Sequence, residues 1–308
     1  MNQAFYNIIC NKPLTKDIYE MKLEGDTSHI TAPGQFINIK LDGFYLRRPI
    51  SICDYDDKTI TIIYKVVGHG TADMTKLVEG NRIDVLCGLG NGFDTSKSGA
   101  KAVLIGGGVG VPPMYNLCKK LLAEGKDVTV ILGFNTKDEI FYENEFKALG
   151  AKVFVSTVDG SYGTKGFVTD ALKDIDYDYF FTCGPMPMFK AIEKIAETSG
   201  QYSFEERMGC GFGACMGCSC KTKYGNKRIC RDGPVLEREE IIWYTQRLIF
   251  AALSLIIPLS PLRVRSDSAM NLQSFTISTV SALFRSKAQQ KTPASVTPPP
   301  ESQNAKEV

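Results

Sequence analysis

Residues 102–113, Ala102-Val103-Leu104-Ile105-Gly106-Gly107-Gly108-Val109-Gly110-Val111-Pro112-Pro113, decide the class of the fold. The stretch opens with a short, wholly apolar run, which is typical of a strand covered on both faces of its sheet. Glycines follow, and apolar residues at helical spacing then occupy positions 114–122. A buried strand, a glycine turn and a helix in this order predict a parallel α/β domain.

The same alternation of strand and helix continues toward the C-terminus. We expect further strands at 128–132, 153–155 and 179–182, and helices near 143–149 and 186–197. Alternation at this spacing is typical of a nucleotide-binding domain with a parallel sheet. We assign this domain to residues 99–200.

Residues 1–98 have the pattern of an antiparallel β domain. The runs 36–41 and 59–64 alternate apolar and polar side chains and are rich in β-branched residues. Turn-forming pairs such as Pro33-Gly34 and Asp42-Gly43 separate the runs. Short strands at this spacing predict an antiparallel barrel or sandwich.

Two further segments follow the α/β domain. Residues 201–243 form a compact, cysteine-rich segment, whereas residues 244–308 contain no Gly, no Cys, ten Ser and six of the 14 Pro. The apolar run 248–262 is broken by Pro258 and is shorter than the roughly 20 residues of a membrane-spanning helix. We therefore expect an appended, atypical extension that is disordered from about residue 287, with a weak membrane or partner contact as the alternative, and we assign no function from it.

Composition and charge exclude several classes of protein. With 44% hydrophobic and 23% charged residues, the chain has the composition of an ordinary soluble protein. The formal net charge of +2 includes seven Lys and Arg against three Asp and Glu in residues 244–308, so residues 1–243 carry −2. This distribution argues against nucleic-acid binding. The first residues lack the pattern of a secretory signal, so we expect a cytoplasmic protein.

The strongest chemical signal is a cluster of cysteines. Cys210, Cys215, Cys218 and Cys230 form the pattern C-x4-C-x2-C-x11-C, which is the plant-type spacing of [2Fe–2S] ligands. Small residues between the first two ligands allow the loop to approach the cluster and to aim N–H groups at its sulfur atoms. Four thiolates also suit a structural zinc ion. We expect Cys220 to point away from the cluster, and the other five cysteines to pack as small apolar side chains.

Two turns in the α/β domain predict a dinucleotide site. Gly106, Gly107, Gly108 and Gly110 would let the backbone approach a pyrophosphate at the start of a helix. Cys183-Gly184-Pro185 follows a later strand at the edge where such sheets bind ligands, and Cys183 could flank a nicotinamide. An acidic ribose ligand is not found directly after the second strand, so the sequence leaves both NAD and NADP open.

A third group of residues, in the first domain, suits a flavin nucleotide. Arg48-Pro49-Ile50-Ser51 offers a guanidinium group and a hydroxyl to a diphosphate. Ile63-Tyr64-Lys65 could lie along an isoalloxazine edge, and the turn with Gly70 and Thr71 could present backbone N–H groups to phosphate. No catalytic acid or base is evident.

The order of these motifs resembles the ferredoxin–NADP reductase superfamily. Within it, residues 46–51, 106–113 and 205–211 resemble the electron-transfer subunits of dihydroorotate dehydrogenase B. The resemblance covers residues 1–243 and leaves residues 244–308 without a counterpart. It implies FAD on a β-barrel, held by Arg48–Ser51, Ile63–Lys65, Gly70 and Thr71, and NAD on the middle domain.

The resemblance also implies a partner. The [2Fe–2S] cluster would face an FMN-containing catalytic subunit that oxidises dihydroorotate to orotate in pyrimidine (UMP) biosynthesis, in a heterotetramer with two copies of each chain. Nicotinamide gives two electrons as a hydride, a cluster takes one, and a flavin does either. We therefore expect FAD to convert between the two, in an oxidoreductase subunit that is not embedded in a membrane.

Two other interpretations stay open at this point. The chain could serve another oxidoreductase, such as a ferredoxin–NADP reductase or sulfide dehydrogenase complex, in which some members replace one cluster thiolate by Asp. It could also be a zinc-stabilised nucleotide-binding module without turnover. Four available thiols favour the dihydroorotate system.

Overall fold

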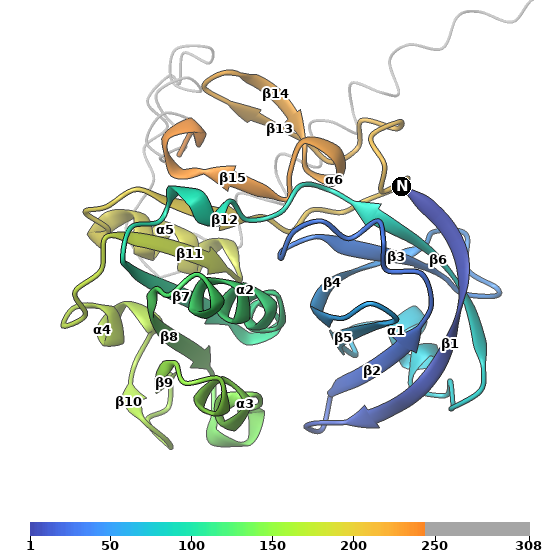
Figure 1. Cartoon of the computed structure of the whole chain (residues 1–308), viewed down its shortest axis with the longest axis horizontal. Coiled ribbons are helices and arrows are strands. Elements are labelled where there is room, and N and C mark those ends of the chain that lie inside the picture. Colours follow the sequence, from blue (N-terminus) through green and yellow to red (C-terminus); the bar gives the residue numbers. More distant parts are fainter. Residues whose placement is uncertain (244–308) are drawn as a thin grey trace, which may run out of the picture. The chain divides into compact units, whose positions relative to one another are not determined.

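Two sheets organise the chain: a closed six-stranded barrel and a seven-stranded, mostly parallel sheet (Figure 1). The computed structural model describes residues 1–243. The expectations for residues 244–308, including the apolar run and the disordered end, lie outside these residues. Within residues 1–243, no helix is long and apolar enough to cross a membrane.

The barrel is built from antiparallel strands in the order β1-β2-β5-β4-β3-β6, and it closes where β6 pairs with β1. Closure leaves no unpaired strand edge, and alternate side chains fill the interior. Ile60 and Ile62 of β5, for example, are both fully buried. The strands are β1 (Asn2–Pro13), β2 (Ile18–Glu24), β3 (Phe36–Lys40), β4 (Arg48–Tyr55), β5 (Thr59–Lys65) and β6 (Arg82–Leu89), with the short helix α1 (His69–Met74) between β5 and β6.

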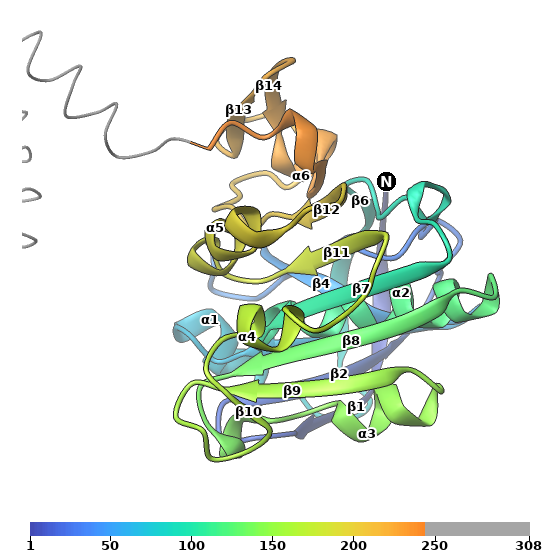
Figure 2. The same ribbon diagram turned by 90° about the vertical axis from the view of Figure 1, so that its left-hand side faces the viewer.

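The second sheet has the order β10-β9-β8-β7-β11-β12-β15, of which Figure 2 labels β10 to β12. Only β15 runs antiparallel to its neighbour. The chain moves outward from β7 to β10 and then returns to place β11 on the other side of β7. The carboxyl ends of β7 and β11 therefore form the switch point at which such sheets bind ligands. The strands are β7 (Lys101–Gly107), β8 (Asp127–Phe134), β9 (Lys152–Thr157), β10 (Thr164–Lys165), β11 (Tyr179–Cys183), β12 (Gly200–Ser203) and β15 (Val235–Glu237).

Helices cover both faces of this sheet, which explains why β7 is apolar from Ala102 to Ile105. Leu104 packs in one core with side chains of α2 (Pro112–Ala123) and α3 (Glu143–Ala148). Val103 and Ile105 face a second core with α4 (Val168–Leu172) and α5 (Met186–Ile195). The fold class predicted from the sequence is confirmed, a β-barrel followed by a parallel α/β domain.

Strand β4 of the barrel packs against helix α2 of the second sheet, and a small polar network fixes this contact. The Asp54 carboxylate accepts hydrogen bonds from the Asn116 amide and the Lys119 ammonium group, each at 2.8 Å. The Tyr142 hydroxyl donates to Glu20 of β2 at 2.8 Å. These contacts set how the barrel faces the carboxyl ends of β7 and β11.

The cysteine-rich segment is joined to the second sheet. Its strands β12 and β15 pair with each other, and β12 also pairs with β11. Between them lie the hairpin β13 (Ser219–Thr222) and β14 (Gly225–Arg228), and the short helix α6 (Ile229–Asp232). The domain boundaries at 98/99 and 200/201 stay a prediction.

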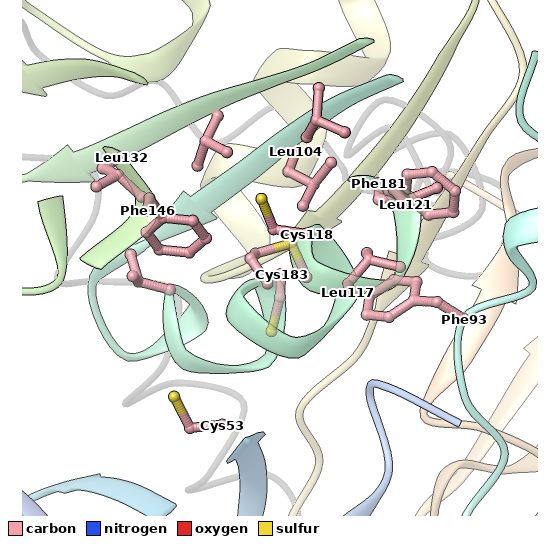
Figure 3. Packing of buried hydrophobic residues seen from close by; sticks show 14 of the residues in the cluster. Cys53, Phe93, Leu104, Leu117, Cys118, Leu121, Leu132, Phe146, Phe181 and Cys183 are labelled. Carbon is pink, nitrogen blue, oxygen red and sulfur yellow. The ribbon is translucent and has the colours of Figure 1, made fainter. Parts of the chain in front are cut away.

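Single cysteines pack in the cores, as expected (Figure 3). Cys53, Cys87, Cys118 and Cys183 are buried, whereas Cys10 is half-buried. Burial raises the pKa of the Cys118 thiol to about 12, so this group stays neutral. These side chains act as small apolar groups.

The first prediction concerns the turn after β7. A Cβ atom on Gly110 would lie 2.2 Å from the carbonyl oxygen of Cys183, so only glycine allows this approach of the turn to β11. We expect Gly110→Ala to lower the free energy of unfolding by about 2 kcal/mol, measured by chemical denaturation at equal flavin content. The control is Gly68→Ala, because a Cβ atom at this position would meet no atom within 4 Å. This substitution should lower the free energy of unfolding by less than about 1 kcal/mol. Equal losses in both variants would contradict the argument.

Candidate functional site

A cavity of about 350 Å³ lies on the barrel beside β4 and β5. It brings together Arg48, Pro49, Ile50 and Ser51 of β4, Ile63, Tyr64 and Lys65 of β5, and Thr71 of α1. They meet because β4 and β5 are neighbours in the barrel and α1 follows β5 directly. All residues predicted to hold a flavin nucleotide except Gly70 thus line one cavity.

The two consecutive arginines have different roles. Arg47 makes a bidentate ion pair with Asp84, with distances of 2.9 and 3.0 Å, and so ties the segment before β4 to β6. Arg48 lies over the Phe44 ring at 4.7 Å, and among residues 1–243 no carboxylate pairs with it. The Arg48 guanidinium can therefore pair with an anionic ligand, whereas Arg47 is already paired with Asp84. The sequence alone did not distinguish these two roles.

The turn at Gly70 and Thr71 supports Arg48. A Cβ atom on Gly70 would lie 2.2 Å from Nε of Arg48, so glycine leaves the space that the guanidinium needs. The Thr71 hydroxyl accepts hydrogen bonds from the N–H groups of Val67 at 2.9 Å and Gly68 at 3.2 Å. Gly70 and Thr71 thus shape the turn from within. The first N–H groups of α1 are the ones left for a phosphate.

A second cavity of about 550 Å³ opens at the carboxyl ends of β7, β8 and β11. Gly107, Gly108, Gly184 and Pro185 line it, as expected for a dinucleotide site. Its other lining residues include Gly133 near the end of β8, Asn135 directly after β8 and Ser156 of β9, as well as Phe167 and Val168 at the start of α4.

Three residues predicted for this site do not line the cavity. A Cβ atom on Gly106 would lie 2.9 Å from Cα of Val111, and Gly110 is pressed against the end of β11. Both glycines therefore allow close backbone packing beneath the cavity. The Cys183 side chain is 1% exposed, and burial raises the pKa of its thiol.

The two cavities adjoin, because Lys65, Val109 and Glu205 line both of them. Glu205 was not among the predicted site residues. Glu205 is exposed at the wall of the cavities, but the protein around its carboxyl group removes part of its hydration, which raises its pKa. Only the return of β12 to the sheet places it there, so no local pattern could have identified it.

A second acidic residue that the prediction missed is Glu139. It lines the larger cavity, and its Oε2 atom accepts hydrogen bonds from the side chain of Asn135 at 2.8 Å and from its backbone N–H at 3.2 Å. Asn135, and not an acidic residue, directly follows β8 in the sequence. The chain instead returns the carboxylate to the strand end through a short 3-10 helix, Lys137–Glu139.

The four thiols of the cysteine-rich segment lie in two pairs. The Cys210 sulfur accepts hydrogen bonds from the N–H groups of Ala214 at 3.2 Å and Cys215 at 3.4 Å. The Cys218 sulfur accepts one from the N–H group of Cys230 at 3.4 Å. Burial opposes ionisation of Cys210, but backbone donors led by Cys215 and Phe212 outweigh it and lower the pKa of this thiol to about 6.

This arrangement fits a [2Fe–2S] cluster. Two pairs of thiolates with backbone N–H donors aimed at sulfur are the environment that two bridged irons require. A tetrahedral zinc ion needs its ligands around one point. Among residues 1–243, no three Cys, His, Asp or Glu side chains are arranged to hold a single ion. Cys220 lies on β13, opposite Lys227, as a half-buried residue.

Family comparisons match both parts of the site. Residues 104–194 match the oxidoreductase NAD-binding domain, and residues 205–242 match the iron-sulfur cluster binding domain of dihydroorotate dehydrogenase B.

Solved structures share the fold. The structure of NADH-dependent reduced ferredoxin-NADP oxidoreductase, studied for flavin-based electron bifurcation, has a TM-score of 0.71 and 28% identity, over 82% of this chain and 99% of that one. A ferredoxin NADP+ reductase from Neisseria gonorrhoeae with bound FAD and NADP has a TM-score of 0.55 and 19% identity, over 63% and 90% of the two chains. The second likeness shows the fold alone.

Curated relatives show the family. The electron transfer subunit of dihydroorotate dehydrogenase B (NAD(+)) from Geobacillus sp. is 44% identical over 256 residues, which cover 79% of this chain and 99% of the relative. The relative of the same name from Fusobacterium nucleatum is 46% identical, over 73% of this chain and 93% of its own length. The two cavities and the thiol pairs agree with these matches. The chain belongs to the family of dihydroorotate dehydrogenase B electron transfer subunits.

Proposed function

We propose that this chain carries electrons between NAD(H) and an FMN-containing subunit that oxidises dihydroorotate, by way of FAD and a [2Fe–2S] cluster. The observation that carries the proposal is the shared wall of the two cavities, formed by Lys65, Val109 and Glu205. The relatives are named as electron transfer subunits of dihydroorotate dehydrogenase B, which supports a catalytic partner. A cytoplasmic assembly with two copies of each subunit is part of the same proposal.

The cavity on the barrel has the groups that FAD needs. Arg48 and Ser51 would hold the diphosphate, and β5 would lie along the isoalloxazine ring. When bound, the flavin exchanges a hydride with the nicotinamide and single electrons with the cluster. Val109 lines both cavities, so its apolar side chain would lie between the two bound ligands.

The iron-sulfur segment borders the flavin cavity. Met208 and Pro234 line that cavity, and Met208 precedes the first cluster ligand by two residues. Cys210 and Cys215 would hold one iron, and Cys218 and Cys230 the other, following the observed pairs. The chain thus holds its cluster next to its flavin.

Glu139 favours NAD over NADP as the dinucleotide. A carboxylate at the end of the second strand can accept hydrogen bonds from a ribose diol, and it would repel a 2′-phosphate. Glu139 lies in the cavity, and Asn135 holds its Oε2 atom in place.

A second candidate is a subunit of another flavin and iron-sulfur reductase. The likeness to reduced ferredoxin-NADP oxidoreductase, at 28% identity over 99% of that chain, favours it as the alternative.

Reconstitution separates the two candidates. The full chain is mixed with an FMN-containing dihydroorotate dehydrogenase subunit and NAD+, and the reduction of NAD+ to NADH is followed after dihydroorotate is added. The proposal predicts turnover only with both chains present. A brown-yellow protein that reduces dyes with NADH but never couples to that subunit would support the alternative, whereas a colourless protein that contains zinc would refute both.

The second prediction tests the flavin site. Arg48→Ala should weaken FAD binding by about 2 kcal/mol, or roughly 30-fold in Kd, because it removes an unpaired guanidinium from the diphosphate. The matched control is Lys58→Ala, which removes one positive charge from the exposed turn between β4 and β5. Flavin fluorescence titration of the cofactor-depleted full chain measures both. Equal FAD affinities in the two variants would place the diphosphate elsewhere.

The third prediction tests the cluster ligands. Cys215→Ser should reduce the iron retained per chain about tenfold or more, while flavin content and NADH–dye reduction persist. Cys220→Ser is the matched control and should keep the iron, because Cys220 makes no pair with the four thiols. Iron analysis and the paramagnetic signal after reduction check both variants, and full iron in Cys215→Ser would refute the ligand assignment.

The fourth prediction tests the dinucleotide preference. Glu139→Gln should narrow the ratio of kcat/KM for NADH over NADPH by about tenfold in dye reduction, because the charge that repels a 2′-phosphate is lost. The exposed neighbour Asp138 lies outside the cavity, so Asp138→Asn removes the same charge as a control. An unchanged ratio in Glu139→Gln would contradict this role.

A further inference from the structure

Asn38 is a buried residue that lines neither of the two cavities. It lies on β3, it is 1% exposed, and it pairs across the ladder with Pro49 of β4. Its backbone neighbour therefore belongs to the strand that lines the flavin cavity.

The Asn38 side chain reaches the cluster loop. Its Nδ2 atom donates a hydrogen bond to the carbonyl oxygen of Cys210 at 3.3 Å. Among residues 1–243, this is the one hydrogen bond between the barrel and residues 208–218. A Cβ atom on Gly211 would lie 2.3 Å from the same Nδ2 atom, so the glycine at this position lets the amide approach the loop backbone.

The other end of the amide is left without a partner. Oδ1 of Asn38 is fully buried and accepts no hydrogen bond from residues 1–243. A buried acceptor without a donor costs on the order of its desolvation, whereas an apolar side chain of the same size would avoid that cost. Packing alone therefore does not explain an amide at position 38.

The cluster loop depends on few anchors. Phe212, Cys215 and Met216 are exposed, whereas Gly211 and Gly213 are buried. Gly213 is held within its own segment, because the Arg228 side chain donates to its carbonyl oxygen at 2.9 Å. Gly211 lies against Asn38, whose side chain gives the loop its hydrogen bond to the barrel, whereas Phe36 of the barrel shares a hydrophobic core with Cys218.

We propose that Asn38 is a positioning residue that holds the first cluster ligand, Cys210, in register with the flavin-lining strand β4. The expected effect on electron transfer rests on the proposed function, because the rate of transfer depends on the separation of flavin and cluster. The physical content of the inference is narrower, because it states that the Asn38 amide restrains residues 210–215.

Amide hydrogen exchange of the full chain tests this restraint. Asn38→Leu keeps the side-chain volume and removes the hydrogen bond, so exchange at residues 210–215 should accelerate about fivefold. Stopped-flow mixing with NADH should show cluster bleaching slowed relative to flavin reduction, by about threefold or more. Asn38→Ala serves as the second variant if the leucine disturbs Gly211.

A matched control comes from Asn91, whose side chain also binds the cysteine-rich segment. Its amide donates to the carbonyl of Val235 at 2.8 Å and accepts from the Val235 N–H at 3.0 Å, away from the thiols. Asn91→Leu should leave exchange at residues 210–215 unchanged. Equal acceleration in both variants, or none in the Asn38 variants, would overturn the proposal. Iron and flavin analysis of the same samples tests the proposed function separately. Loss of iron would count against the proposed function, whereas the exchange rates at residues 210–215 test only the restraint by Asn38.

Discussion

The close approach of the glycine turn after β7 to the end of β11 is the constraint on which the rest of the site depends. Gly110 faces the Cys183 carbonyl at a distance that excludes any side chain. This contact brings the two strand ends together at the switch point, where the larger cavity opens. It also places Val109 at the boundary with the flavin cavity. One backbone contact thus positions the dinucleotide site against the barrel.

The cysteine-rich segment connects three structures. Strands β12 and β15 tie it to the edge of the parallel sheet, while residues 204–208 pass along the flavin cavity before the first ligand. The loop itself is bonded to the barrel through Asn38. A chain organised in this way can keep a flavin and a cluster at a fixed separation, since the loop is attached on both sides.

Neighbouring charged residues of the flavin site have different partners. Arg47 and Asp84 neutralise each other within the barrel, whereas Arg48 next to it is left to the cavity. At the other cavity, Glu139 contributes a negative charge, which in the proposed function would suit a ribose diol and oppose a 2′-phosphate. Neighbouring residues of like type therefore separate into structural and ligand-facing roles according to what lies across from them.

The sequence by itself determined the fold class, predicted the four thiols as one ligand set, and named most of the residues that line the cavity on the barrel. These features follow from local rules: the apolar run and glycines at 102–113 encode a strand and a turn, and the spacing of Cys210, Cys215 and Cys218 encodes a loop around a cluster. Only the tertiary structure separated Arg48 from Arg47, put Gly106, Gly110 and Cys183 beneath the cavity, and revealed Glu139, Glu205 and Asn38. Each of these depends on contacts between segments far apart in sequence or on the path of a return loop, and periodicity and spacing carry no information about such contacts.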